Sequence, residues 1–91
     1  TANELIVEEA IVFVASLSKE RLINKMEFKR LNNFILSESQ LKVLQKKFKD
    51  WIKQLIDPQN KKKLIDARSK FFEGTLDKQE YDLLREEILG L

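Results

Sequence analysis

The chain has 91 residues, of which two are glycine, one is proline and none is cysteine or histidine. The lack of cysteine excludes disulfides, thiolate catalysis and zinc–thiolate sites, and the lack of histidine removes the commonest general base and transition-metal ligand. Because glycine and proline are scarce while lysine, glutamate and leucine are abundant, we expect a compact all-α domain of five helices joined by short turns; the net charge is +2.

The first predicted helix covers residues 3–17. Thr1 and Glu4 have the spacing of a capping box, although Asn3 could serve as the N-cap instead. Apolar side chains are so frequent after this start that we expect the helix to be buried on more than one side. The apolar run at 11–17 is too short to span a bilayer and follows no basic segment, so we expect neither a membrane span nor a secretory signal.

The second predicted helix covers residues 24–36. Asn24 is followed three positions later by Glu27, which again has the form of a capping box. A segment of serines and charged residues at 16–21 separates the two helices, so we expect them to form a hairpin. The apolar positions expected to face the core are Phe28, Leu31, Phe34 and Ile35.

A long central helix is predicted over residues 39–56. At 3.6 residues per turn its apolar residues form one stripe, and its lysines form a second stripe that points away from the first. One side should therefore be core and the other a lysine ridge. The apolar residues are Leu41, Leu44, Phe48, Trp51, Ile52 and Leu55. The lysine ridge consists of Lys42, Lys46, Lys49 and Lys53.

The last two predicted helices cover residues 58–73 and 77–89. Asp57 is an N-cap residue and is followed by proline at the first helical position, where the missing N–H has no cost. Gly74 should end the fourth helix in a left-handed conformation. The fifth helix begins with another capping-box pair, Asp77 and Glu80.

A shift of 53 residues aligns the segment 11–36 with the segment 64–89. In both copies an aliphatic residue precedes the capping box and an aromatic residue follows it, where the two could form a hydrophobic staple. The alternative is that any two capped amphipathic helices look alike. From the repeat we predict two similar hairpins, 3–36 and 58–89, packed on either side of the central helix 39–56 within one domain.

The turn Gly74-Thr75-Leu76-Asp77 is followed by Glu80-Tyr81 and by a closing Ile88-Leu89. In these residues the segment 64–89 resembles the SHOCT module, a short helical hairpin at the C-termini of many bacterial proteins. The resemblance implies a role in interaction or oligomerisation and no catalysis. The first copy departs from this pattern because Arg21 stands where the second copy has its glycine.

Both copies also resemble degenerate EF-hands, whose loop oxygens at positions 1, 3, 5, 9 and 12 bind calcium. These positions hold Ser16, Ser18, Glu20, Asn24 and Glu27 in the first copy, and Ser69, Phe71, Glu73, Asp77 and Glu80 in the second. Neither copy has aspartate at position 1, Arg21 replaces the first glycine, and Phe71 removes a ligand. We therefore expect no calcium binding and interpret the polar residues as helix caps.

The charge is distributed unevenly along the chain. Residues 41–63 carry eight lysines and two aspartates, whereas residues 1–40 and 64–91 have net charges of −1 and −3. The lysine ridge, extended by Lys61-Lys62-Lys63, could follow a phosphate backbone or an anionic membrane surface, or it could simply be the solvated side of a helix. No helix-turn-helix glycine turn or arginine-rich recognition helix accompanies it, so sequence-specific recognition is not expected.

No phosphate-cradling glycine loop, nucleophile elbow or convergent carboxylate pair appears, so we predict that the protein is not an enzyme and uses no cofactor or metal. We predict a cytoplasmic module that binds another protein or regulates it, and that could also self-associate. One alternative is a small nucleic-acid-associated protein, and another is an EF-hand-like domain that has lost calcium binding. Trp51 is either a core residue or an interface anchor. The predicted partner-binding residues are Lys42, Lys46, Lys49, Trp51 and Lys53.

Overall fold

The structure is a computed structural model that describes residues 2–91, with side chains from Glu4 onward. Thr1 and the side chain of Asn3, the two alternatives for the first N-cap, lie outside this part. Within residues 2–91 there are five α-helices and no strand, which confirms the predicted all-α class. The helices are α1 (Ala2–Lys19), α2 (Lys25–Ser39), α3 (Lys46–Leu55), α4 (Pro58–Phe72) and α5 (Lys78–Leu89).

The predicted caps fix where three of the helices begin. The side chain of Asn24 accepts a hydrogen bond from the N–H of Glu27 at 2.7 Å, and the Glu27 carboxylate accepts one from the N–H of Asn24 at 3.0 Å. Asp77 and Glu80 form the same capping box at the start of α5. Asp57 caps α4 by accepting a hydrogen bond from the backbone N–H two residues on. Each of these bonds satisfies an N–H group that has no partner inside its helix.

The turns that close the two hairpins have the same backbone conformation. Arg21 after α1 and Gly74 after α4 both lie in the left-handed region, with φ of 59° and 84°. In each turn the N–H of the following residue donates to the carbonyl five positions earlier at 2.9 Å. This bond is the hallmark of the Schellman motif. Gly74 therefore ends its helix as predicted, and Arg21 adopts the same conformation although it has a side chain.

The predicted central helix 39–56 is wrong at its N-terminal end, because α2 continues to Ser39 and α3 begins only at Lys46. Residues 40–45 form a turn, in which Leu41 is 42% exposed instead of lying on an apolar helical stripe. The cause is the tertiary packing of α2 and α3. Ile35 of α2 and Phe48 of α3 are both buried in one core, and the two helices can share it only if the chain changes direction between them. The predicted burial of the later stripe residues is confirmed for Leu44, Phe48, Ile52 and Leu55.

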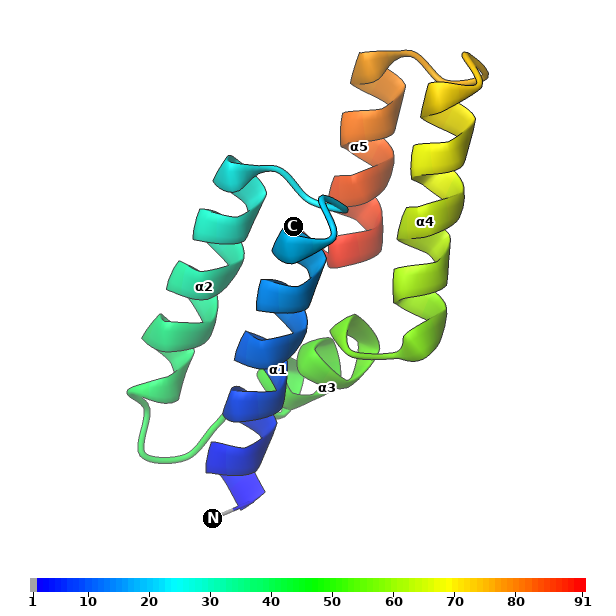
Figure 1. Cartoon of the computed structure of the whole chain (residues 1–91). Coiled ribbons are helices and arrows are strands. Elements are labelled where there is room, and N and C mark those ends of the chain that lie inside the picture. Colours follow the sequence, from blue (N-terminus) through cyan, green and yellow to red (C-terminus); the bar gives the residue numbers. More distant parts are fainter. Residues whose placement is uncertain (1) are drawn as a thin grey trace.

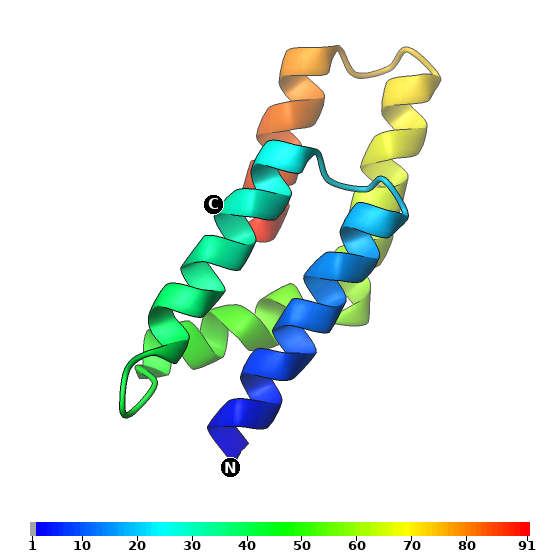
Figure 2. The same cartoon turned by 60° about the vertical axis from the view of Figure 1, so that its left-hand side comes forward.

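The two hairpins, α1–α2 and α4–α5, have their turns pointing the same way but are offset, so that the α4–α5 turn extends beyond the α1–α2 turn, and α3 runs crosswise below the open end of α4–α5 (Figure 1, Figure 2). They contact each other directly. Arg68 of α4 donates a hydrogen bond to the carbonyl oxygen of Glu20 at 2.8 Å, and Lys61 forms an ion pair with the Glu20 carboxylate. The expected arrangement, in which a long helix separates the hairpins, is therefore corrected to two hairpins in direct contact, with the short helix α3 running crosswise to them.

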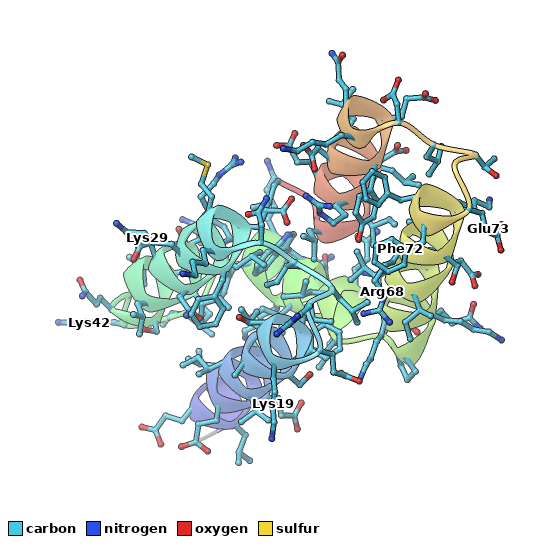
Figure 3. The ribbon with its side chains drawn as sticks, turned by 45° about the horizontal axis from the view of Figure 1, so that its top comes forward. Lys19, Lys29, Lys42, Arg68, Phe72 and Glu73 are labelled. Atoms are coloured by element: carbon cyan, nitrogen blue, oxygen red, sulfur yellow. The ribbon has the colours of Figure 1, made fainter. Side chains whose placement is uncertain are left out.

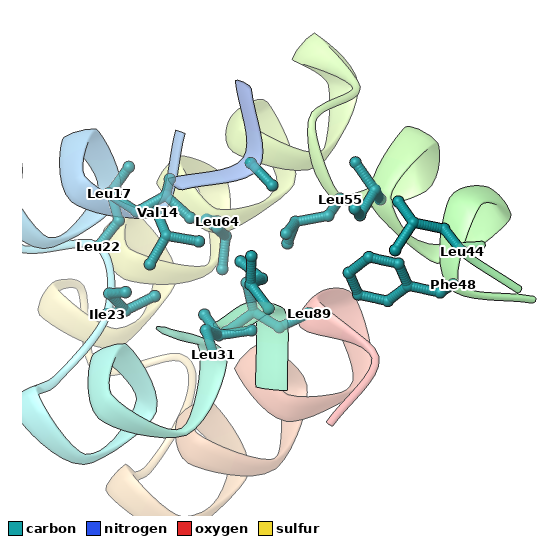
Figure 4. Close-up of a cluster of buried hydrophobic side chains, with 13 residues drawn as sticks. Val14, Leu17, Leu22, Ile23, Leu31, Leu44, Phe48, Leu55, Leu64 and Leu89 are labelled. Carbon is teal, nitrogen blue, oxygen red and sulfur yellow. The ribbon is translucent and has the colours of Figure 1, made fainter. Parts of the chain in front are cut away.

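All five helices contribute to one cluster of buried apolar residues (Figure 4). Leu64 of α4 and Leu89 of α5 reach the same cluster as Leu31 of α2, so the two hairpins share a core rather than having one each. By contrast, α1 is not buried on more than one side as expected, because Leu5 and Val12 are 61% and 67% exposed. No helix in residues 2–91 has the length and apolar content needed to cross a bilayer.

Candidate functional site

An open groove surrounds Trp51, where α2, α3 and the C-terminal end of α5 meet. It encloses about 700 Å³, and we call it the Trp51 groove. Aromatic and charged side chains from α2 and α3 line it. Its lining includes Arg30, Phe34, Lys47, Phe48, Trp51 and Gly90.

The indole of Trp51 is held in a fixed orientation. Its Nε1–H group donates a hydrogen bond to the carbonyl oxygen of Leu89 at 3.1 Å. The ring of Phe34 meets it edge to face at 4.9 Å between centroids, and the ring of Phe48 stacks on it at 5.9 Å. Aromatic pairs in these arrangements are attractive beyond their apolar area. Trp51 is nevertheless only half-buried, so one part of a rigid aromatic surface faces the groove.

Gly90 allows the end of α5 to approach this indole. Its φ is 73°, and a Cβ atom there would lie 2.7 Å from the indole nitrogen of Trp51. The carbonyl of Leu89 belongs to the last turn of α5, where carbonyl groups have no partner within the helix. The indole N–H of Trp51 therefore supplies the hydrogen-bond donor that the Leu89 carbonyl lacks within α5. The same side chain also lines the groove.

The structure divides the predicted binding residues between separate surfaces. Lys46, Lys49 and Lys53 lie on one face of α3. At 100° per residue, Trp51 is about 140–160° away from each of these lysines around the helix axis, so it lies on nearly the opposite face. Lys42 is not on a helix but in the turn 40–45, and it projects outward from the molecule (Figure 3). The lysine ridge is therefore continuous only over α3, and the lysine beside the Trp51 groove is Lys47.

Trp51 was predicted as a partner-binding residue, but its neighbours in the groove were not. Phe34 was expected to face the core and is 41% exposed at the groove, and Gly90 directly follows the predicted last helix, 77–89. The one available signal was Trp51 itself, which could be either a core residue or an interface anchor. Residues 34 and 90 are far from it in the chain, so only the packing of α2 and α5 against α3 reveals them.

A second cluster, away from the groove, contains the only buried charged side chains in the described part of the chain. Glu27 Oε1 accepts a hydrogen bond from Arg85 Nε at 2.9 Å, although the two residues are 58 positions apart. Arg85 also binds Asp82 and lies over the ring of Tyr81 at 4.2 Å. Burial alone would lower the pKa of Arg85, but the hydrogen bond and charge of Glu27, together with Tyr81, raise it above its ordinary value. This cluster joins α2 to α5.

The contacts of Glu27 and Glu20 are relevant to the EF-hand resemblance, because both residues occupy calcium-ligand positions of the first loop. Glu27, at position 12 of the first loop, is occupied by the Asn24 cap and by Arg85. Glu20, at position 5, pairs with Lys61 of the other hairpin. From residue 2 to residue 91, no three carboxylates are grouped so that they could hold a metal ion. The capping boxes that were the simpler explanation of these side chains are present in both hairpins.

Similarity to known proteins gives no further indication of the function. No protein-family model, curated protein sequence or solved structure matches this chain. The resemblances to SHOCT modules and to EF-hands stay predictions. Among the surfaces described above, the Trp51 groove is the one that combines aromatic side chains in fixed orientations with open access.

Proposed function

We propose that this protein is a non-enzymatic protein–protein interaction or regulatory module, and that it binds its partner at the Trp51 groove. The observation that carries the proposal is a tryptophan that is held by three neighbours and is still open to a groove of about 700 Å³. Tryptophan contributes more to binding energy at protein interfaces than most other residue types. Because its orientation is already fixed, binding would cost little additional side-chain entropy.

The lysines of α3 have a supporting role in this proposal. Lys46, Lys49 and Lys53 form no ion pair with any residue of the described chain, so their charge is available to a partner. These three lysines lie on nearly the opposite side of α3 from Trp51, so their charge acts at a distance from the groove and mainly increases the association rate of a partner of opposite charge. The proposed partner-binding residues remain Lys42, Lys46, Lys49, Trp51 and Lys53, now joined by Phe34 and Lys47.

Affinity capture from the source cells tests this proposal. The wild-type chain and the variants Phe34→Ser and Lys47→Glu would be immobilised, and the proteins retained by each would be identified by mass spectrometry. A partner of the groove should be retained by wild type and depleted about tenfold with either variant, which corresponds to ~1.4 kcal/mol. The purified partner should then change the fluorescence of Trp51, which is the only tryptophan in the chain.

The matched control is Leu83→Ser, which removes an exposed apolar side chain of α5 outside the groove. Circular dichroism of each variant would verify that the helices are retained. If wild type and all three variants retain the same proteins in the same amounts, the groove is not the binding site.

A second candidate function is nonspecific binding to nucleic acid through the lysine ridge. It is favoured by three unpaired lysines on one face of α3. Each lysine that neutralises a phosphate releases a counterion, so the affinity should fall steeply with salt. In a gel-shift titration, replacing Lys46, Lys49 and Lys53 by Gln should reduce the slope of log affinity against log salt by about 0.9 for each phosphate that is no longer neutralised.

The control for that titration replaces Lys25, Lys29 and Lys78 by Gln, which removes the same charge from exposed positions on α2 and α5. Equal loss of affinity in the two triple variants would mean that only the net charge matters. No measurable binding of the wild type at low salt would end the nucleic-acid proposal.

We also propose that the two hairpins are copies of one unit, repeated after 53 residues. Their matching Schellman turns and capping boxes support this, because both occur at equivalent positions in the alignment. A SHOCT-like unit would favour self-association, which sedimentation velocity at increasing concentration would detect. An EF-hand-like origin without calcium binding would leave Trp51 fluorescence unchanged on addition of calcium.

A further inference from the structure

The outer face of α1 carries apolar side chains that the fold leaves uncovered. Leu5 and Val12 are 61% and 67% exposed, and they are seven residues apart on the same side of the helix. Beside them is a shallow hollow of about 540 Å³, whose other apolar walls are Phe13 and Ile56. We call this surface the α1 face. It shares no lining residue with the Trp51 groove.

The hollow on the α1 face is lined by negative charge. Glu8 and Glu9 are the only charged residues that line the hollow, and both are exposed. Neither forms an ion pair or side-chain hydrogen bond with another residue of the described chain. An apolar surface bordered by free carboxylates attracts a cationic partner and repels phosphate groups, so nucleic acids and anionic membranes do not suit it.

The spacing of the apolar residues indicates the shape of the occupant. A stripe with positions seven residues apart, about 10 Å along the helix axis, is the type of surface on which a second helix packs. Helices that bind in this way contribute apolar anchors at i, i+3, i+4 and i+7. Lysine or arginine beside those anchors would meet Glu8 and Glu9.

We propose that the α1 face binds an amphipathic helix of a partner protein, in which an apolar stripe is bordered by lysine or arginine. The apolar stripe would cover Leu5 and Val12, and the flanking cations would pair with the two glutamates. This site is separate from the Trp51 groove, so the chain would have two docking surfaces with different partners.

A fluorescein-labelled synthetic peptide of about 18 residues, or about five helical turns, provides the test. It carries leucines at helical spacing flanked by lysines, and a second peptide has glutamate in place of every lysine. Fluorescence anisotropy with the full chain should show binding of the lysine peptide, weaker binding at higher salt, and at least about tenfold weaker binding of the glutamate peptide.

Variants then locate the binding site. Val12→Ser and Leu5→Ser should each weaken binding of the lysine peptide about tenfold, whereas Leu83→Ser, an equally exposed apolar residue on α5, should not. The double variant Glu8→Lys and Glu9→Lys should prefer the glutamate peptide. Because all these positions are exposed, the fold should be retained, which circular dichroism verifies.

Three results of the peptide experiments would each overturn the proposal. They are equal binding of the two peptides, no binding of the lysine peptide, or equal effects of Val12→Ser and Leu83→Ser. A concentration-dependent dimer of the wild type that is lost in Val12→Ser would also overturn it, because a second copy of the chain would then cover the face. None of these results depends on the Trp51 groove, so the two proposals can fail independently.

Discussion

Glu27 both caps a helix and neutralises a buried charge. Its backbone N–H and its carboxylate complete the capping box with Asn24, and the same carboxylate neutralises Arg85 in the interior. Glu80 occupies the equivalent capping position in the other hairpin but is exposed and has no arginine beside it. A buried charge whose partner is removed is costly, whereas an exposed capping carboxylate is replaced by an amide at little cost.

Glu27→Gln should therefore lower the free energy of unfolding by about 3 kcal/mol, because the amide can still cap the helix but leaves Arg85 with a weaker partner. Glu80→Gln should change it by less than about 0.5 kcal/mol. Urea titrations of both variants followed by circular dichroism would measure the two values. Similar losses in the two variants would show that Glu27 acts only as a cap.

The effects of replacing Gly90 and Gly74 by alanine can also be compared. Both have positive φ, so alanine at either position should cost about 1–2 kcal/mol of backbone strain. Only at Gly90 would the new methyl group also meet Trp51, whereas the space around Gly74 is open. Gly90→Ala should thus destabilise the protein more and shift the emission of Trp51, while Gly74→Ala should leave the emission unchanged. Unaltered emission in Gly90→Ala would contradict the close approach of α5 to the indole.

Among the elements, the two Schellman turns show how one backbone shape is formed by different residues. Gly74 reaches the left-handed region without steric conflict, whereas the Cβ atom of Arg21 is crowded there. The next residues, Leu22 and Ile23, are buried in the core, so the direction of the chain after α1 is fixed by packing. The first turn therefore keeps its shape despite an unfavourable residue.

Arg21→Gly should relieve this crowding. The left-handed penalty of about 1–2 kcal/mol exceeds the cost of the extra freedom that glycine has in the unfolded chain, about 0.4–1 kcal/mol, so the variant should be more stable by about 0.5 kcal/mol or more. The reciprocal variant Gly74→Arg should be less stable. Thermal unfolding of both would measure these effects, and a destabilised Arg21→Gly would mean that the arginine side chain has a stabilising role.

At the level of the whole molecule, the question is what joins the two hairpins. Arg30 and Glu86 form an ion pair at 3.6 Å, but both side chains are about half exposed, and such pairs contribute only about 0–1 kcal/mol. The apolar cluster contains residues from all five helices, and burial of one leucine contributes about 1.5–3 kcal/mol. The shared core, together with the Glu27–Arg85 pair, should therefore make the hairpins unfold together.

Leu64→Ala tests this cooperativity, because Leu64 is a fully buried residue of α4 in the common cluster. The variant should lose about 2–5 kcal/mol. Its unfolding curves by circular dichroism, which reports all helices, and by fluorescence of Trp51 on α3 should move together to lower denaturant. The exposed Leu83→Ala is the control. Two separate transitions would show that the hairpins are independent units.

The sequence by itself determined where three of the five helices, α2, α4 and α5, begin. Asn24 with Glu27, Asp77 with Glu80, and Asp57 before proline were identified correctly, because a capping bond joins residues only two or three positions apart. The burial of Phe48 and Leu55 also followed from the sequence, since helical periodicity places them on one side of α3.

Only the tertiary structure decided where α3 begins, what surrounds Trp51 and which side of α1 stays open. Periodicity shows that a helix has an apolar face but not whether another element covers it, so the exposure of Val12 was not predictable. The contact of Trp51 with Phe34 and the pairing of Glu27 with Arg85 join residues 17 and 58 positions apart. Such contacts depend on how whole helices pack, and no local pattern specifies that.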